Sequence, residues 1–245
     1  MNAFIKMTWT ELKLNLREPV GAFFTLAFPV LLLVLFGGIY GNEPSEFFGG
    51  FGTVDVSVPG YIGMIIGTVG MIGIPITISN YREQGILRRY RATPIKPGVI
   101  LWSQVAVNVL MALLGILILI IAGRLLYDLR FPAGPWGILP AIIIGSLGFF
   151  SLGFVLASVL GTPRTAQAVG MALFYPMLFL SGAALPRQIM PETIQRIAEF
   201  LPLTHVVILL EDLWFDNSWN LVSTAVILAM FAICLFVTRR TFKWE

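Results

Sequence analysis

Six stretches of about 20 consecutive residues carry no Asp, Glu, Lys, Arg or His, and they constrain the fold more than any other feature. A helix needs about this length of mostly apolar chain to cross the hydrocarbon core of a bilayer. The sequence therefore predicts an all-α membrane protein with six transmembrane helices. The predicted spans are Val20–Tyr40, Pro59–Ser79, Val99–Gly123, Trp136–Leu160, Thr165–Leu185 and Leu221–Thr238.

The composition of the 245-residue chain agrees with this class. Apolar residues make up 57% of the sequence and charged residues 12%, about half the charged fraction of an average soluble domain. A single cysteine cannot form a disulfide within the chain, which excludes a disulfide-stapled domain. The formal net charge of +3 is too small to indicate a nucleic-acid partner. We expect one transmembrane domain over residues 1–245.

Basic residues are divided unevenly between the two sides of the predicted bundle. Twelve Lys and Arg residues lie on the side of the two termini and four on the other side, which also holds nine of the thirteen acidic residues. Loops rich in Lys and Arg stay in the cytoplasm. The sequence therefore predicts that both termini are cytoplasmic.

Residues 3–18 are predicted to form an amphipathic helix that does not span. Ile5, Trp9, Leu12 and Leu16 would share one face, beside a polar face that includes Lys13. A short helix with one apolar and one basic face is typical of segments that lie at a membrane interface. We expect this N-terminal helix, residues 1–19, to lie at the cytoplasmic interface.

Residues 186–219, between the fifth and sixth predicted spans, are expected to be external. Pro191 can open a short helix. Residues 200–213 contain a 10-residue apolar core without Asp, Glu, Lys or Arg, broken only by Thr204 and His205. This core is too short to cross a bilayer. The sequence predicts short external helices, one of them re-entrant.

The interiors of the six spans lack ionisable side chains. Carriers driven by protons or sodium usually keep such groups inside the membrane, so ion coupling is disfavoured. Gln104 and Asn108 lie at positions i and i+4 on one face of the third span. We favour hydrogen bonding between helices over cavity lining for this pair, and both alternatives stay open.

Small residues form two ridges that would let helices approach closely. Tight packing is the favoured interpretation, and the alternative is that the ridges form contacts along which helices slide during a conformational change. Pro75 and Pro176 are expected to bend the second and fifth spans. The ridges are Gly60, Gly63, Gly67 and Gly70 in the second span, and Gly153, Ala157 and Gly161 in the fourth.

The sequence offers little support for hydrolytic chemistry. It has no Gly-x-Ser-x-Gly or Gly-x-Ser-Gly motif and no Gly-x-x-x-x-Gly-Lys-Ser/Thr loop to cradle ATP phosphates. His205 is expected to be a packed or interfacial residue, and Cys234 a small hydrophobic one. We therefore expect no catalytic residue and no metal site.

Residues 80–98, NYREQGILRRYRATPIKPG, form the most basic cytoplasmic segment. A short helix from Tyr81 to Tyr90 would present Ile86, Leu87 and Tyr90 together before the following prolines end it. A compact apolar surface on a basic loop is suited to docking onto another protein. The sequence therefore predicts a protein-binding site here.

Two segments resemble parts of the type-2 ABC exporter permeases, the transmembrane subunits of bacterial ABC exporters. REQGILRRYRATPIKPGVILWSQ resembles the family's cytoplasmic loop, where Glu, Gly and then Thr-Pro precede the third span. FLSGAALPRQIMPETIQRIAEFLPLTHVVILLEDLW resembles the stretch after the fifth span, with its Pro-rich turn, short helix and Pro-Leu-Thr-His segment. The six-span plan fits too, so the resemblance covers nearly the whole chain.

The resemblance implies a permease subunit of the bacterial inner membrane that pairs with a second copy of itself or a similar permease. Each half would bind a cytoplasmic ABC ATPase subunit, two copies in all. ATP and Mg²⁺ would bind to that partner, and this chain would bind no cofactor. On this analogy Arg82, Glu83, Ile86, Leu87 and Tyr90 form the coupling helix, and the N-terminal helix is a second contact with the ATPase.

The resemblance also makes residues 186–213 an external gate that includes Pro202, His205, Glu211 and Asp212. Family members often carry a basic residue after the re-entrant segment, whereas Glu211 and Asp212 occupy that place here. The charge at this place therefore differs from the family pattern.

Residues and resemblance together predict an exporter that works by alternating access. The uncharged, aromatic-rich interior favours an amphipathic or apolar substrate, such as a drug-like molecule or a lipid-linked glycan. Phe174 and Tyr175, with Gln104 and Asn108, are the candidate cavity residues. Membrane lipids are expected partners. A passive channel or a non-transporting scaffold is the alternative, and an intramembrane hydrolase comes after these.

Overall fold

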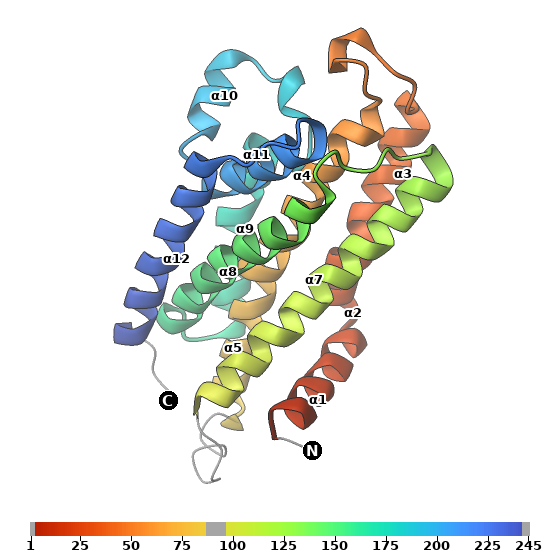
Figure 1. The fold of residues 1–245 in the computed structure, drawn as a ribbon. Helices are drawn as coiled ribbons and strands as arrows, with labels where there is room; N and C mark the ends of the chain where they lie inside the picture. The colour runs from red at the N-terminus through yellow and green to blue at the C-terminus, as the bar shows by residue number, and fades with distance from the viewer. Residues whose placement is uncertain (1–2, 87–96, 242–245) are drawn as a thin grey trace.

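The computed structural model describes residues 3–86 and 97–241, and it is helical throughout this part apart from turns and one isolated bridge between Ser45 and Phe51. The helices form an elongated bundle (Figure 1). Both termini lie at one end of the bundle, together with the ends of α1 and α12. The α3–α4 connection, α10 and α11 lie at the opposite end.

Within the described residues, five helices are long and apolar enough to cross a membrane by length and composition. They correspond to five of the six predicted spans. Two of them contain a π-helical segment, η1 or η3, within the helix. The five are η1–α3 (Phe23–Ala27 and Phe28–Tyr40), α4–η3–α5 (Thr53–Thr68, Val69–Gly73 and Ile74–Glu83), α7 (Pro97–Tyr127), α8 (Pro135–Val159) and α12 (Leu221–Thr241).

The fifth predicted span corresponds to α9 (Pro163–Leu180). It is not among the five, because Arg164 and Gln167 in its first turns lower its mean hydropathy. The prediction that this helix continues to Leu185 was wrong. The chain turns after Ser181 because Gly182 has a φ of +93°, a conformation that favours glycine. The total of six spans therefore stays a prediction.

The second span is longer than predicted at both ends, running from Thr53 to Glu83 rather than from Pro59 to Ser79. The helix is longer because the polar residues on either side of the apolar stretch remain helical. It ends at the Gln84–Gly85 turn, where Gly85 has a φ of +67°. The predicted start of the short helix at Tyr81 was therefore wrong, because Tyr81 to Glu83 belong to α5. Residues 87–90 of that predicted helix lie outside the described residues.

The predicted N-terminal helix is present as α1 (Ala3–Arg17), and α2 (Pro19–Ala22) leads from it into η1. The apolar side chains of α1 point away from the bundle: Ile5, Trp9 and Leu16 are exposed, and Leu12 is half-buried. Glu11, in contrast, is buried against the bundle. An apolar face turned outwards suits a membrane interface, and that location stays a prediction.

The glycine ridge of the second span packs tightly, as its favoured interpretation predicted. A Cβ on Gly67 would lie 2.5 Å from the Phe174 ring, and one on Gly153 of α8 would lie 2.1 Å from the carbonyl oxygen of Gly70. Including Gly161 in the second ridge was wrong. It lies beyond the end of α8, and a Cβ there would have no neighbour within 4 Å.

Short helices occupy the segments that were predicted to be external: η2 (Glu46–Phe48), η4 (Arg187–Ile189), α10 (Glu192–Ala198) and α11 (Pro202–Phe215). Pro191 precedes α10, as predicted. α11 packs against α4, α8 and α12 and buries Leu203, Val207 and Leu210. It therefore caps the bundle, and its depth in a membrane stays a prediction.

Candidate functional site

The two π-helical segments of the bundle have a common local cause. η1 ends two residues before Pro29, and η3 ends two residues before Pro75. Proline has no N–H, so the carbonyl four residues earlier loses its usual helical partner and the helix can widen by one residue. A π-helical segment thus precedes Pro75, and the bend expected there stays a prediction. Such segments occur frequently at functional sites.

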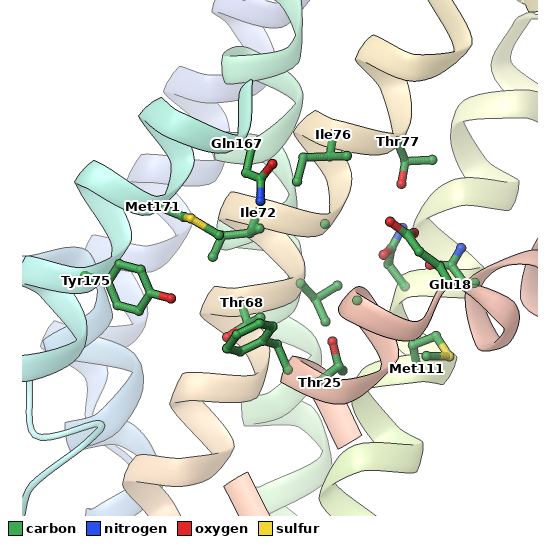
Figure 2. Close-up of a pocket in the computed structure, with 16 residues that line it drawn as sticks. Glu18, Thr25, Thr68, Ile72, Ile76, Thr77, Met111, Gln167, Met171 and Tyr175 are labelled. Atoms are coloured by element: carbon green, nitrogen blue, oxygen red, sulfur yellow. The ribbon is translucent and has the colours of Figure 1, made fainter. Parts of the chain in front are cut away.

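A pocket lies where the two π-helical segments approach each other. Figure 2 shows Gln167, Met171 and Tyr175 of α9 on one side and Glu18 and Thr25 on the other, with the α4–η3–α5 helix between them. We call this pocket the seam. It is lined by Asn15, Glu18, Gly21, Phe24, Thr25, Thr68, Val69, Ile72, Gly73, Ile76, Thr77, Asn108, Met111, Gln167, Met171 and Tyr175.

The seam is polar without being strongly charged. Hydroxyl and amide groups, such as those of Thr68, Thr77 and Gln167, alternate with apolar side chains. Glu18 is the one carboxylate among the lining residues, and it is exposed. Met111 and Met171 add flexible, polarisable surface that adapts to differently shaped ligands. This lining can contact both halves of an amphipathic molecule.

The cavity in the seam has a volume of about 70 Å³. Sites for drug-sized ligands enclose roughly 300–1,000 Å³. A molecule of that size therefore enters only if the helices separate or if another surface completes the site.

Glycines let neighbouring helices approach the carbonyl oxygens that the prolines leave without an α-helical partner. A Cβ on Gly115 of α7 would lie 2.7 Å from the Thr25 oxygen, and one on Gly170 of α9 would lie 2.4 Å from the Met71 oxygen. Cα–H groups can contact carbonyl oxygens at such close approaches. The backbone of η1 therefore packs closely against α7, and that of η3 against α9.

Two of the four predicted cavity residues line the seam: Asn108 and Tyr175. Gln104 is buried and donates from Nε2 to the Tyr81 hydroxyl oxygen at 3.5 Å. Asn108 donates from Nδ2 to the Gln104 carbonyl oxygen at 2.8 Å. Phe174 is buried against Gly67. Gln104 thus bridges helices, whereas Asn108 bonds within α7 and lines the seam.

A polar cluster ties three helices together near the end that carries the termini. The Tyr81 hydroxyl of α5 donates to the buried carboxylate of Glu11 of α1, and Gln104 of α7 donates to the same hydroxyl. Arg82 donates to the Leu160 carbonyl oxygen at 3.1 Å. Residue 81 therefore links α5 to both α1 and α7.

Three of the predicted coupling residues are described. Arg82 and Glu83 form the end of α5, with Glu83 exposed, and Ile86 follows the turn and is half-buried. Leu87 and Tyr90 lie outside the described residues. The coupling role of all five stays a prediction.

Four predicted gate residues lie along α11. Pro202 begins the helix. His205 is hydrogen-bonded to the Glu199 carbonyl oxygen at 2.9 Å and lies 3.3 Å from the Ser223 hydroxyl. Asp212 accepts a 2.8 Å hydrogen bond from Asn220. These contacts join α11 to the segment before it and to α12.

Glu211 of α11 forms an ion pair with Arg187 of η4 at 3.8 Å, with both side chains largely buried. Burial raises the pKa of Glu211 to about 7, although the positive charge of Arg187 acts in the opposite direction. The negative charge of Asp212 raises the pKa further. Desolvation outweighs the ion pair here. The pair joins the loop after α9 to α11.

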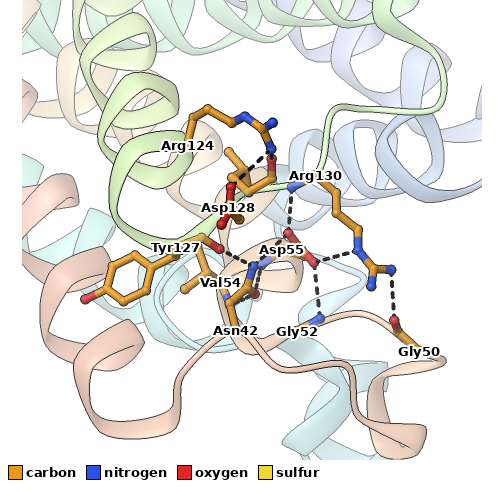
Figure 3. A network of polar contacts seen from close by, with 10 residues as sticks. Asn42, Gly50, Gly52, Val54, Asp55, Arg124, Tyr127, Asp128 and Arg130 are labelled. Carbon is orange, nitrogen blue, oxygen red and sulfur yellow. Dashed lines mark hydrogen bonds and ion pairs between the residues drawn. The ribbon is translucent and has the colours of Figure 1, made fainter.

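A second polar network, at the end of the bundle opposite the termini, was not expected from the sequence (Figure 3). The buried carboxylate of Asp55, in the first turn of α4, accepts hydrogen bonds from the backbone N–H groups of Gly52 and Arg130 at 3.2 and 3.0 Å. Asn42 donates to it at 3.2 Å, and the Arg130 guanidinium pairs with it at 3.6 Å. Asp55 thus holds the α3–α4 and α7–α8 connections together.

Within the described part of the chain, no three His, Cys, Asp or Glu side chains gather as metal ligands.

Comparison with known proteins identifies the family. A family model described as "ABC-2 type transporter" matches residues 2–215. This chain belongs to the ABC-2 type transporter family. The ABC-2 match covers every element from α1 to α11, so the seam and the external segments all lie within the family domain.

Three relatives illustrate the similarity within the ABC-2 family. The transport permease ycf38 of Porphyra purpurea is 24% identical over 86% of this chain and 73% of its own length. The daunorubicin resistance ABC transporter permease protein DrrB1 of Streptomyces coeruleorubidus is 24% identical over 74% of this chain and 62% of its own. The inner membrane transport permease YhhJ of Escherichia coli K12 is 27% identical over 72% and 50%. These names support a transmembrane transporter subunit.

Sequence reasoning missed most of the seam. Thr25, Thr68 and Gln167 are isolated polar residues in apolar stretches, and each could equally bond its own helix. One signal was available: Pro29 and Pro75 mark the two helices whose backbones widen.

Proposed function

We propose that this protein is the transmembrane subunit of an ATP-driven exporter in the bacterial cytoplasmic membrane, with both termini in the cytoplasm. It moves an amphipathic or apolar molecule outwards by alternating access. The seam is the observation that carries this proposal: a mixed polar and apolar surface between two π-helical segments, in a chain of the ABC-2 family. A drug-like molecule or a lipid-linked glycan has suitable chemistry.

The seam is completed by a second permease subunit. Its present volume is too small for such a molecule. It lies between α9 and η1, where Phe23, Leu173 and Tyr175 are exposed. A second copy or a similar permease placed against this face would enclose the substrate path between two seams.

ATP hydrolysis is assigned to a separate ABC ATPase, one on each half of the dimer. The sequence has no phosphate-cradling loop, and the seam has no ionisable side chain beyond Glu18 and Tyr175. An ion gradient therefore has few groups in the seam on which to act.

Reconstitution separates this function from the alternatives. The purified protein and its ATPase in vesicles should concentrate a fluorescent amphipathic drug in an ATP-dependent manner, even when an uncoupler collapses the proton gradient. Movement only down the gradient, with or without ATP, would support a passive channel, and no movement would support a scaffold. Concentrative transport abolished by the uncoupler at constant ATP would refute the ATP-driven proposal.

Variants of the seam connect the site to the activity. Gln167→Leu removes a polar group from the seam and should change the ranking of transported drugs, whereas Gln188→Leu, at an exposed external position, should not. Both variants should bind the ATPase normally. An unchanged drug ranking in Gln167→Leu would remove the seam from the substrate path.

Coupling to the ATPase is tested at the cytoplasmic loop. Replacing Leu87 and Tyr90 by serine should weaken ATPase binding in a pull-down, because an apolar anchor at a docking site can contribute about 2 kcal/mol. Val159→Ser, an exposed apolar residue at the end of α8, is the matched control. Normal ATPase binding by the double variant would show that the loop's charge only sets the topology.

A further inference from the structure

A second cavity, of about 380 Å³, lies among α7, α8 and α12, away from the seam. α8 packs closely along α12, whereas α7 touches α8 only sparsely. Each of the three helices contributes residues to the lining of this cavity. We call it the α7–α12 groove. It is lined by Trp102, Val105, Leu147, Phe150, Ser151, Phe154, Phe231, Leu235, Thr238 and Arg239.

The groove is apolar over most of its length and basic at one end. Arg239 lies in the last turn of α12, near the end of the bundle that carries the termini, and forms no ion pair with any described residue. The neighbouring Thr238 hydroxyl is buried without a hydrogen-bond partner in the described part of the chain. Trp102 is 62% exposed and lies near the same end. The polar end therefore offers a cation and an unused hydroxyl.

The length of the groove matches one leaflet of a bilayer. Phe231 and Arg239 are eight residues apart on α12, which corresponds to about 12 Å along a helix. Half of the hydrocarbon core is about 15 Å thick. The groove thus runs from the membrane interface at Arg239 to near the midplane at Phe231, and Trp102 lies at the depth where tryptophan is enriched.

We propose that the α7–α12 groove binds an anionic phospholipid from the leaflet on the side of the termini. Its phosphate lies against the Arg239 guanidinium and the Thr238 hydroxyl, and one acyl chain lies along Phe154 and Leu235 towards Phe231. The guanidinium fork pairs well with phosphate oxygens. This binding does not depend on the proposed export function.

Native mass spectrometry of the purified full-length protein tests the site. The protein is exchanged into equal amounts of phosphatidylglycerol and phosphatidylcholine. The wild type should retain phosphatidylglycerol preferentially. Arg239→Gln should reduce that preference about five-fold, the usual effect of one arginine near a membrane surface. Thr238→Val, which removes only the hydroxyl, should lower the retention of both lipids, because both carry the phosphate that the hydroxyl would contact.

Matched controls separate the groove from the general surface charge. Arg240→Gln removes the same charge one residue away, but Arg240 stacks on Phe236 at 4.2 Å and does not line the groove. Its charge acts only from the general surface, so this variant should reduce the preference less than Arg239→Gln does. Leu235→Trp should fill the groove and displace the lipid, whereas Ile233→Trp, exposed on α12 outside the groove, should not.

Several results would overturn the proposal. Equal retention of the two lipids by the wild type would remove the specificity. Equal losses in Arg239→Gln and Arg240→Gln would leave only diffuse surface charge, and full retention in Leu235→Trp would place the lipid elsewhere. Efficient disulfide cross-linking between two copies through Leu235→Cys would show that a second copy occupies the groove.

Discussion

Replacing Gly170 by alanine would force α9 away from the π-helical segment η3. Gly170 is buried in α9, and a Cβ there would lie 2.4 Å from the carbonyl oxygen of Met71. That oxygen belongs to the backbone and cannot swing aside as a flexible side chain can. Ordinary van der Waals contact begins near 3.4 Å, so the two helices would have to separate by about 1 Å.

The energetic cost of Gly170→Ala follows from this overlap. Adding one carbon to a well-packed contact costs about 1–3 kcal/mol when the backbone has to shift. For a chain of this size, each kcal/mol lowers the midpoint of thermal unfolding by about 2–4 °C. The expected decrease is therefore roughly 2–12 °C.

Thermal unfolding of the purified protein in detergent, followed by tryptophan fluorescence, measures this decrease. Gly161→Ala is the matched control, because a Cβ there would have no neighbour within 4 Å. It should unfold within error of the wild type. If Gly170→Ala unfolds at the same temperature as Gly161→Ala, the close contact between α9 and η3 does not exist.

Three further outcomes are expected. Asp55→Ala leaves backbone donors without their acceptor and should cost about 1–3 kcal/mol in thermal unfolding, whereas Arg196→Ala, which loses an exposed ion pair with Glu192, should be nearly neutral. Because the pKa of Glu211 is raised from 4.5 to about 7, the folded protein holds this proton more tightly, so unfolding midpoints should fall as the pH rises from about 4.5 to 7; Glu211→Gln should flatten this profile, and an unchanged profile would contradict it. A cysteine at Gln188 should react with an impermeant thiol reagent applied to intact cells and one at Gln84 should not, since labelling of Gln84 would reverse the proposed orientation.

Long apolar stretches made the spans predictable, because few sequences other than membrane helices need them. α12 is the clearest case, with ends within a few residues of the prediction. Helix ends were harder, because a helix continues into polar sequence until a glycine turns it, as at Gly85 and Gly182. Asp55 illustrates the same difficulty: it reads as an external loop acid in the sequence, yet it is a buried residue of α4.

The seam could be predicted only in part, because its residues come from five separate segments. Asn108 and Tyr175 were proposed from their chemistry alone. Gln104 has the same chemistry and one helical turn of separation from Asn108, yet it faces Tyr81. Which of two such residues reaches a cavity depends on the rotation of the helix against its neighbours, and the third span has apolar residues on every side.

The closest backbone contacts divide the bundle into two groups of helices. In one group, η1 is pressed onto α7 through Gly115, and α1 packs along α7. In the other, η3 is pressed onto α8 through Gly153 and onto α9 through Gly170, and α8 packs along α12. The three glycine contacts would clash if a Cβ were added, so η1 is fixed against α7, and η3 against α8 and α9.

The seam and the α7–α12 groove both lie on the boundary between these two groups, because each is lined by α7 and by helices of the other group. Polar contacts cross the boundary at both ends: Asp55 with Arg130 at the end opposite the termini, and Tyr81 with Glu11 and Gln104 at the other. Polar contacts can exchange partners with water or lipid headgroups, whereas interlocked backbones cannot slide. We therefore expect the seam to widen by movement of the α1–η1–α7 group against the rest. A lipid bound in the α7–α12 groove would contact α7 and the α8–α12 pair at once, so its presence should affect the same movement.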